Sequence, residues 1–122
     1  MIVGVPTETY PEERRVALVP ASLPHLIKAG LDLIIEAGAG LKAGFTDAAY
    51  EEHGGRILPD RKQLISSSDM LLYVRGLGAN LEAGRADLEL MRSGQQIVGL
   101  LNPLGELEAT RELANKGITA FA

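Results

Sequence analysis

The stretch QQIVGLLNPLGELEATRELANKGITAFA, residues 95–122, contains one complete strand–helix–strand pattern. The apolar run IVGLL predicts a buried strand, and ITAFA predicts another. Between them, GELEATRELANKG predicts an amphipathic helix that ends at Gly117, with one apolar side formed by Leu107, Thr110, Leu113 and Ala114. Two buried strands joined by a helix are typical of a crossover unit, in which the strands run parallel.

The same alternation continues toward the N-terminus. Further strands are predicted in MIVGVP, LDLIIEAG, RILP (a weak one) and DMLLYVR, and further helices in residues 20–30, 46–53 and 60–68. Thr46 or Asp47 is expected to cap one helix and Asp60 another. Residues 80–94 are predicted to be helical only from about Ala86 to Arg92, because Gly84 interrupts the pattern.

Strands that alternate with short helices predict an α/β domain. We expect a doubly wound, mostly parallel sheet of about six short strands, flavodoxin-like or Rossmann-like. Ligands of such sheets bind beyond the carboxyl ends of the strands, near the point where the strand order reverses.

The composition excludes several classes of protein. The chain has 122 residues, a formal net charge of −4 and no cysteine, which excludes disulfides and zinc–thiolate sites. Nucleic-acid binding is not expected without clustered basic residues, and the two distant histidines, His25 and His53, predict no metal site.

With no signal peptide and no apolar run of about 20 residues, we expect a cytoplasmic domain. The apolar ending ITAFA indicates a fragment of a longer protein.

A glycine-rich segment, EAGAGLKAG, follows the second predicted strand. Gly38, Gly40 and Gly44 approach a dinucleotide fingerprint. The next predicted helix begins near Thr46, beyond the last glycine, so its N-terminus is not placed to hold a pyrophosphate. We interpret the segment as a turn.

The segment TETYPEERRVALVP, residues 7–20, places four charges in the loop after the first strand. Adjacent side chains of an extended segment point in opposite directions, so only one arginine can face a cleft. We expect this to be Arg15, a fork for a carboxylate, while Arg14 pairs with Glu12 or Glu13. A solvated charge cluster is the alternative, and the residues alone favour it.

Polar residues also end two other predicted strands. Arg75 follows MLLYV, with Tyr73 two residues earlier and expected on the same side, and Asn102 follows IVGLL. Because parallel strands end at one edge of the sheet, Arg15, Arg75, Tyr73 and Asn102 are the candidate cleft-binding residues. No catalytic residue, metal ligand or cofactor-binding residue is assigned.

The segment VGVPTETYPEERRVALVP resembles the start of proteins of the alanine dehydrogenase and NAD(P) transhydrogenase alpha-subunit family. IIEAGAG, FTDAAYEEHGGRI, SSDMLLYV and LANKGITAFA continue the resemblance along the whole chain. It implies the N-terminal domain of a two-domain oxidoreductase, without the NAD-binding Rossmann domain, that forms one wall of an NAD(H) cleft. It also implies a homo-oligomer, homodimer contacts included, and, for a transhydrogenase, partner subunits that bind NADP(H) and the membrane, so the domain could lie at the cytoplasmic face of the inner membrane.

The resemblance also separates the two branches of the family. Alanine dehydrogenases use an arginine, a lysine and a histidine at these three strand ends. Arg15 matches the arginine, but Tyr73 and Arg75 occupy the lysine's neighbourhood and Asn102 stands at the histidine position. An arginine stays protonated and an asparagine cannot act as acid or base. We therefore expect a transhydrogenase alpha subunit, with an alanine-dehydrogenase-like fragment or a non-catalytic binding or assembly module as alternatives. We expect the fragment alone to be inactive and to bind NAD(H) weakly.

Overall fold

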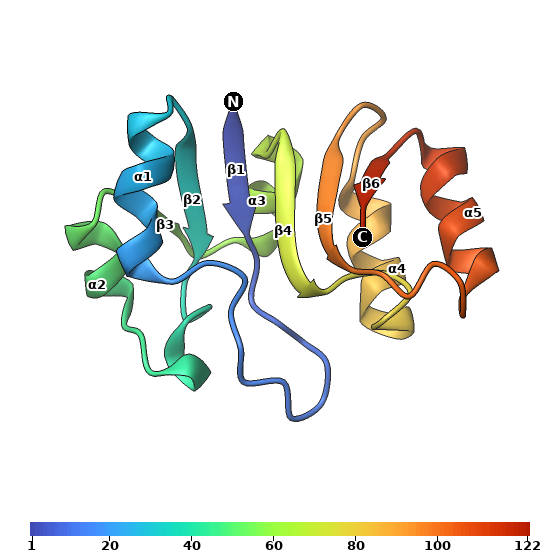
Figure 1. Cartoon of the computed structure of the whole chain (residues 1–122), viewed down its shortest axis with the longest axis horizontal. Coiled ribbons are helices and arrows are strands. Elements are labelled where there is room, and N and C mark those ends of the chain that lie inside the picture. Colours follow the sequence, from blue (N-terminus) through green and yellow to red (C-terminus); the bar gives the residue numbers. More distant parts are fainter.

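The computed structural model describes all residues from Met1 to Ala122, arranged around one six-stranded sheet (Figure 1). The strand order is β3-β2-β1-β4-β5-β6, and every neighbouring pair is parallel. This confirms the predicted doubly wound α/β fold. The strands are β1 (Ile2–Val5), β2 (Asp32–Glu36), β3 (Arg56–Leu58), β4 (Met70–Arg75), β5 (Gln96–Leu100) and β6 (Thr119–Phe121).

The helices divide between the two faces of the sheet. They are α1 (Leu23–Lys28), α2 (Asp47–Glu52), α3 (Arg61–Ser67), α4 (Leu81–Leu90) and α5 (Leu107–Lys116), with short 3₁₀ turns at Pro20–Ser22 and Leu41–Ala43. Leu23 of α1 and Tyr50 of α2 pack in one buried cluster with side chains of β1 and β2. Helices α3 and α5 contribute to the other cluster, which contains side chains of β4 and β5. The strand order reverses between β1 and β4, where a Rossmann-type sheet has its switch point.

One face of the sheet is covered over only half its width. On the side of α1 and α2, no helix of the chain lies over β4, β5 and β6, because the crossovers after β4 and β5 pass over the opposite face (Figure 1). Leu100 and Phe121 are 54% and 52% exposed there. With Val74 and Val98 they line an apolar hollow of about 550 Å³, the sheet-face hollow, which Val16 and Ala17 border.

Local signals place most helix ends. Thr46 caps α2 by accepting the Ala49 N–H, and Asp60 caps α3 by accepting from Lys62 and Gln63, as predicted. Gly117 ends α5 with a left-handed backbone, φ 80°. No helix has both the length and the apolar composition needed to cross a membrane.

The prediction for α4 was wrong at its start. The helix begins at Leu81 rather than near Ala86, and it runs through Gly84. A Cβ at Gly84 would lie 2.8 Å from the Leu77 Cα, so the glycine permits the helix to pack closely on its preceding loop. This contact offsets the cost of glycine in a helix, about 1 kcal/mol.

The predicted apolar side of α5 was also wrong in part. Ala109 and Leu113 are the buried residues, whereas Leu107 is 67% exposed. Thr110 and Ala114 line a hollow beside β6, and within this chain nothing beyond that edge strand covers them.

Candidate functional site

The loop that follows β1, residues 6–19, crosses the carboxyl ends of the central strands and is called here the β1 loop. It hangs below the sheet in Figure 1, beside the ends of β1 and β4. Two of its acidic side chains, Glu8 and Glu13, are buried, with 5% and 6% of each residue exposed. Buried carboxylates need donors. Glu8 finds them at the end of β4, and Glu13 finds them on Arg15 of the loop and Arg75 of β4.

Glu8 binds the main chain of β4. Its two carboxylate oxygens accept the N–H groups of Val74 and Arg75 at 2.8 and 2.9 Å. The paired register of β1 with β4 stops at Leu71, so Glu8 supplies the acceptors that the neighbouring strand no longer offers. Burial raises the pKa of the Glu8 carboxyl.

Glu13 joins the two arginines that the sequence singled out. Its Oε1 accepts from Arg15 Nη2 at 2.9 Å and from Arg75 Nε at 2.8 Å. Its Oε2 accepts from the Nε and the backbone N–H of Arg15 at 2.9 and 3.0 Å. Hydrogen bonds from Arg15 and Arg75 hold the pKa of the Glu13 carboxyl well below its usual range. Arg15 and Arg75 therefore share one carboxylate and meet at its Oε1.

Both guanidinium groups stay accessible. The side chains of Arg15 and Arg75 are 60% and 34% exposed. The Arg75 Cζ lies 4.3 Å from the centre of the Tyr10 ring, a cation–π contact. Arg15 lines the sheet-face hollow, whereas Arg75 and Asn102 line a second hollow of about 590 Å³ beyond the ends of β4 and β5, the strand-end hollow.

The expected ion pair of Arg14 does not form. Glu13 is taken by Arg15 and Arg75, and Arg14 makes no ion pair within the chain. The reason is the alternation of an extended segment, which puts Glu13 and Arg15, two residues apart, on the same side. The same alternation was a signal for this pair that the sequence analysis did not use.

Tyr73 and Arg75 reach different partners, although they were expected on one side of β4. The Tyr73 ring is buried, and its hydroxyl donates to Asp87 Oδ2 of α4 at 3.0 Å. The β4–β5 register shifts between Leu72 and Arg75, so the regular alternation is lost there. Burial also raises the pKa of the Tyr73 hydroxyl well above its ordinary value.

Asn102 lies where the sequence placed it, after β5, in the wall of the strand-end hollow. Its backbone has a φ of 47°, and its carbonyl accepts the Glu106 N–H. The Asn102 amide lies against Gly105, where a Cβ would come within 2.6 Å of its oxygen. Asparagine tolerates this left-handed backbone, so the turn by itself accounts for the residue type.

A second charged cluster fixes the base of the β1 loop. Arg61 of α3 forms a bidentate pair with Asp87, at 2.9 and 2.7 Å, and also donates to Glu36 at 2.7 Å. The same nitrogen that reaches Glu36 donates to the Thr7 carbonyl at 2.9 Å. Helices α3 and α4, strand β2 and the β1 loop thus meet at one guanidinium, and no sequence spacing indicated this cluster.

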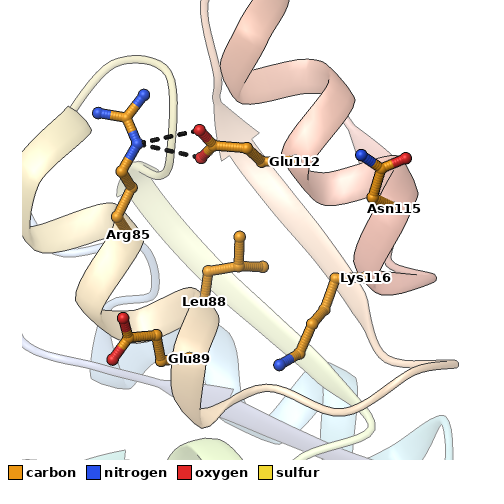
Figure 2. Close-up of a pocket in the computed structure, with 6 residues that line it drawn as sticks. All are labelled: Arg85, Leu88, Glu89, Glu112, Asn115 and Lys116. Carbon is orange, nitrogen blue, oxygen red and sulfur yellow. Dashed lines mark hydrogen bonds and ion pairs between the residues drawn. The ribbon is translucent and has the colours of Figure 1, made fainter.

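Two other features are the glycine-rich segment and a groove between α4 and α5. The glycine segment 38–44 forms a turn, in which the Gly38 N–H donates to Asp47 and a Cβ at Gly40 would meet Tyr50. A polar groove between α4 and α5 is bridged by Arg85 and Glu112 (Figure 2). It is formed by the second halves of both helices, toward the amino ends of the strands, away from the arginines.

The switch point itself does not fit a dinucleotide phosphate. In a Rossmann domain, a glycine-rich turn after the first strand leads directly into a helix that holds the pyrophosphate. Here, 14 residues separate β1 from the first 3₁₀ turn, and Glu8 brings a carboxylate to the ends of β1 and β4. A negative group would replace the hydrogen-bond donors that a pyrophosphate requires.

Comparison with known proteins identifies the family of this domain. The family described as alanine dehydrogenase/PNT, N-terminal domain, matches residues 4–122. The chain belongs to this family. It is 37% identical over 122 residues to an NAD(P) transhydrogenase subunit alpha of Cereibacter sphaeroides and 36% identical to an alanine dehydrogenase of Bacillus subtilis. These matches cover the whole chain but only 22% and 30% of the relatives.

Solved structures of both kinds match the domain equally well. A transhydrogenase from Sinorhizobium meliloti superposes with a TM-score of 0.88 at 32% identity, and an L-alanine dehydrogenase with 0.89 at 34%. The chain is covered completely in both, and it spans 34% and 32% of their lengths. The family resemblance seen in the sequence is thereby confirmed, and the relatives are larger proteins of which this domain is one part.

Proposed function

We propose that the chain is the N-terminal domain of an NAD(P) transhydrogenase alpha subunit, and that its strand-end arginines line one wall of an NAD(H) cleft. The observation that carries this proposal is the arrangement of Arg15 and Arg75 around Glu13. Arg15, Arg75 and Asn102 can hydrogen-bond to an anion, but none of the three exchanges protons near neutral pH. Arginine stays charged, Asn102 has no titratable group, and the Glu13 carboxyl has a strongly lowered pKa.

This lack of an acid or base suits a transfer of hydride between two nicotinamides, which requires no proton transfer. Oxidation of an amino acid to an oxo acid needs a group that accepts a proton from the substrate nitrogen. Arg15, Arg75 and Asn102 offer no such group. Glu8 has a raised pKa, but both of its oxygens are occupied by main-chain N–H groups of β4.

We propose that this domain lines the NAD(H) cleft and does not itself hold the pyrophosphate of the nucleotide. Because Glu8 occupies the switch point, we expect the pyrophosphate of NAD(H) to be held by another domain of the longer protein. The 122-residue chain alone is expected to bind NAD(H) weakly and to catalyse no hydride transfer. In a transhydrogenase, its partners would be the rest of the alpha subunit and the subunits that bind NADP(H) and span the membrane.

An alanine-dehydrogenase-like enzyme is the second candidate. The sequence identity supports this candidate nearly as well, since it is 36% to the Bacillus subtilis alanine dehydrogenase and 37% to the transhydrogenase subunit alpha. Two assays on the longer protein separate the candidates. Hydride transfer from NADH to an NADP⁺ analogue supports the first, whereas NAD⁺-dependent oxidation of L-alanine supports the second.

The arginine wall is tested by paired substitutions in the longer protein. Arg15→Ala removes an accessible cation, and we expect the rate of hydride transfer to fall by about ten- to a hundredfold, as for loss of one charge-assisted contact. Arg14→Ala is the matched control, because Arg14 is the adjacent arginine and makes no ion pair within the chain. Melting curves should stay alike, since Glu13 keeps Arg75 as a partner. Equal rates in the two variants would contradict the proposed role of Arg15.

A further inference from the structure

Glu13 stands out because one buried carboxylate serves two arginines from separate segments. Its four accepted hydrogen bonds come from Arg15 and Arg75 alone. The carboxylate holds the Nε side of both guanidinium groups. For Arg75, the Tyr10 ring additionally covers one face.

What remains free is a defined set of donors. The Nη1 of Arg15 and both terminal nitrogens of Arg75 make no hydrogen bond within the chain. An arginine fixed at its Nε side and on one face presents its terminal edge in a single direction. Such a pre-oriented fork binds planar anionic groups more tightly than a freely rotating one.

Glu13 also sets the charge at this edge. Two guanidinium groups next to one carboxylate carry one net positive charge, whereas without Glu13 they would carry two. Glu8 is bound to the main chain and forms no ion pair with either side chain, although its charge acts on Arg15 from a distance. The number of negative charges that the edge accepts therefore depends on Glu13.

We propose that Glu13 is a positioning and specificity-determining residue: it orients Arg15 and Arg75 together and restricts their edge to ligand groups with a single negative charge. This inference rests on the proposed function, in which these arginines face the ligand. The class of group selected is a carboxylate or a singly charged phosphodiester, and multiply charged phosphates are disfavoured.

The test uses Glu13→Gln in the longer protein, with Glu12→Gln as the matched control, because Glu12 is exposed and makes no ion pair. Calorimetry measures the binding of inorganic pyrophosphate and of acetate. The Coulomb energy of the removed charge is about 1 kcal/mol per unit of ligand charge in water at contact distance. We expect acetate affinity to rise by about fivefold, pyrophosphate affinity by more than about tenfold, and neither to change in Glu12→Gln.

Two further variants separate charge from folding and from other phosphate sites. Glu13→Asp keeps the charge but shortens the side chain, so kcat should fall while pyrophosphate affinity shows none of the gain expected of Glu13→Gln. Adding Arg75→Ala to Glu13→Gln should abolish the gain, which places the new binding at this edge. Pyrophosphate affinity that does not rise in Glu13→Gln, or a gain that survives Arg75→Ala, overturns the inference.

The outcomes distinguish this inference from the proposed function. If Arg15→Ala leaves hydride transfer unchanged, the arginine wall itself is wrong. If Arg15→Ala impairs transfer but Glu13→Gln changes neither anion affinity, the wall stands and only the role of Glu13 is refuted.

Discussion

The two halves of the sheet have similar apolar strands but different surroundings. In β2, Leu33, Ile34 and Ile35 are buried in succession, because α1 and α2 cover one face and α3 the other. In β6, all three residues are exposed. The difference shows that strand composition does not decide burial. The direction of each crossover decides it, and beyond β4 every helix packs on one face only.

The difference between the halves is tested most directly by shortening one apolar side chain in each of them. Ile35→Ala creates a cavity between β2 and its helices and should lower the free energy of unfolding by about 2–5 kcal/mol. Leu100→Ala on the uncovered face should lower it by less than about 1 kcal/mol, because Leu100 is already 54% exposed. Urea denaturation of the 122-residue chain measures both. Equal losses would show that the uncovered face is buried in solution.

A second substitution tests how the halves are joined. Asp87→Ala removes the bidentate partner of Arg61 and the acceptor of Tyr73, so the link from α4 and β4 to α3 and β2 is lost. We expect the free energy of unfolding to fall by about 1.5–3 kcal/mol, since Glu36 still pairs with Arg61. Glu89→Ala, an exposed position of α4, is the control and should change it by less than about 0.5 kcal/mol. A loss no greater than that of the control would mean that apolar packing alone holds the halves together.

The smallest change in the free energy of unfolding is expected from a substitution in the β1 loop, which crosses from one half of the sheet to the other. Glu12 has a φ of 67°, a conformation that glycine adopts without strain. Glu12→Gly should raise the free energy of unfolding by about 0.5–1 kcal/mol, whereas Glu12→Ala, which keeps the Cβ, should not. Denaturation curves of the two variants, recorded side by side, show the difference. A gain in Glu12→Ala would point to relief of charge repulsion instead of backbone strain.

Much of the fold followed from local patterns. Periodicity and glycine stops placed all six strands and the ends of most helices, and Asp60 and Thr46 were identified as caps because capping depends on neighbours in sequence. The start of α4 was missed because Gly84 is favourable only through its contact with Leu77. A contact between separate segments has no local signature.

The residues of the candidate site also differ in whether the sequence alone could predict them. Arg15 and Arg75 were identifiable because parallel strands end at a common edge, and both lie there. Their shared partner, Glu13, was not identified as buried, because the residues EERR by themselves favour a solvated cluster. The assignment of Glu8 to the main chain of β4 spans 66 residues, and it required the tertiary structure.

The central position of β1 has a consequence for how the chain folds. Its pairings with β2 and β4 differ in the length of chain that they enclose, since the Ile2 N–H reaches Asp69 across 67 residues. The entropy lost on closing a loop grows with the logarithm of its length, and contacts between distant segments slow folding. The crossover units of each half can form from local encounters. We therefore expect the pairing of β1 with β4 to form late in folding, and Glu8 to reach the main chain of β4 only after that pairing has formed.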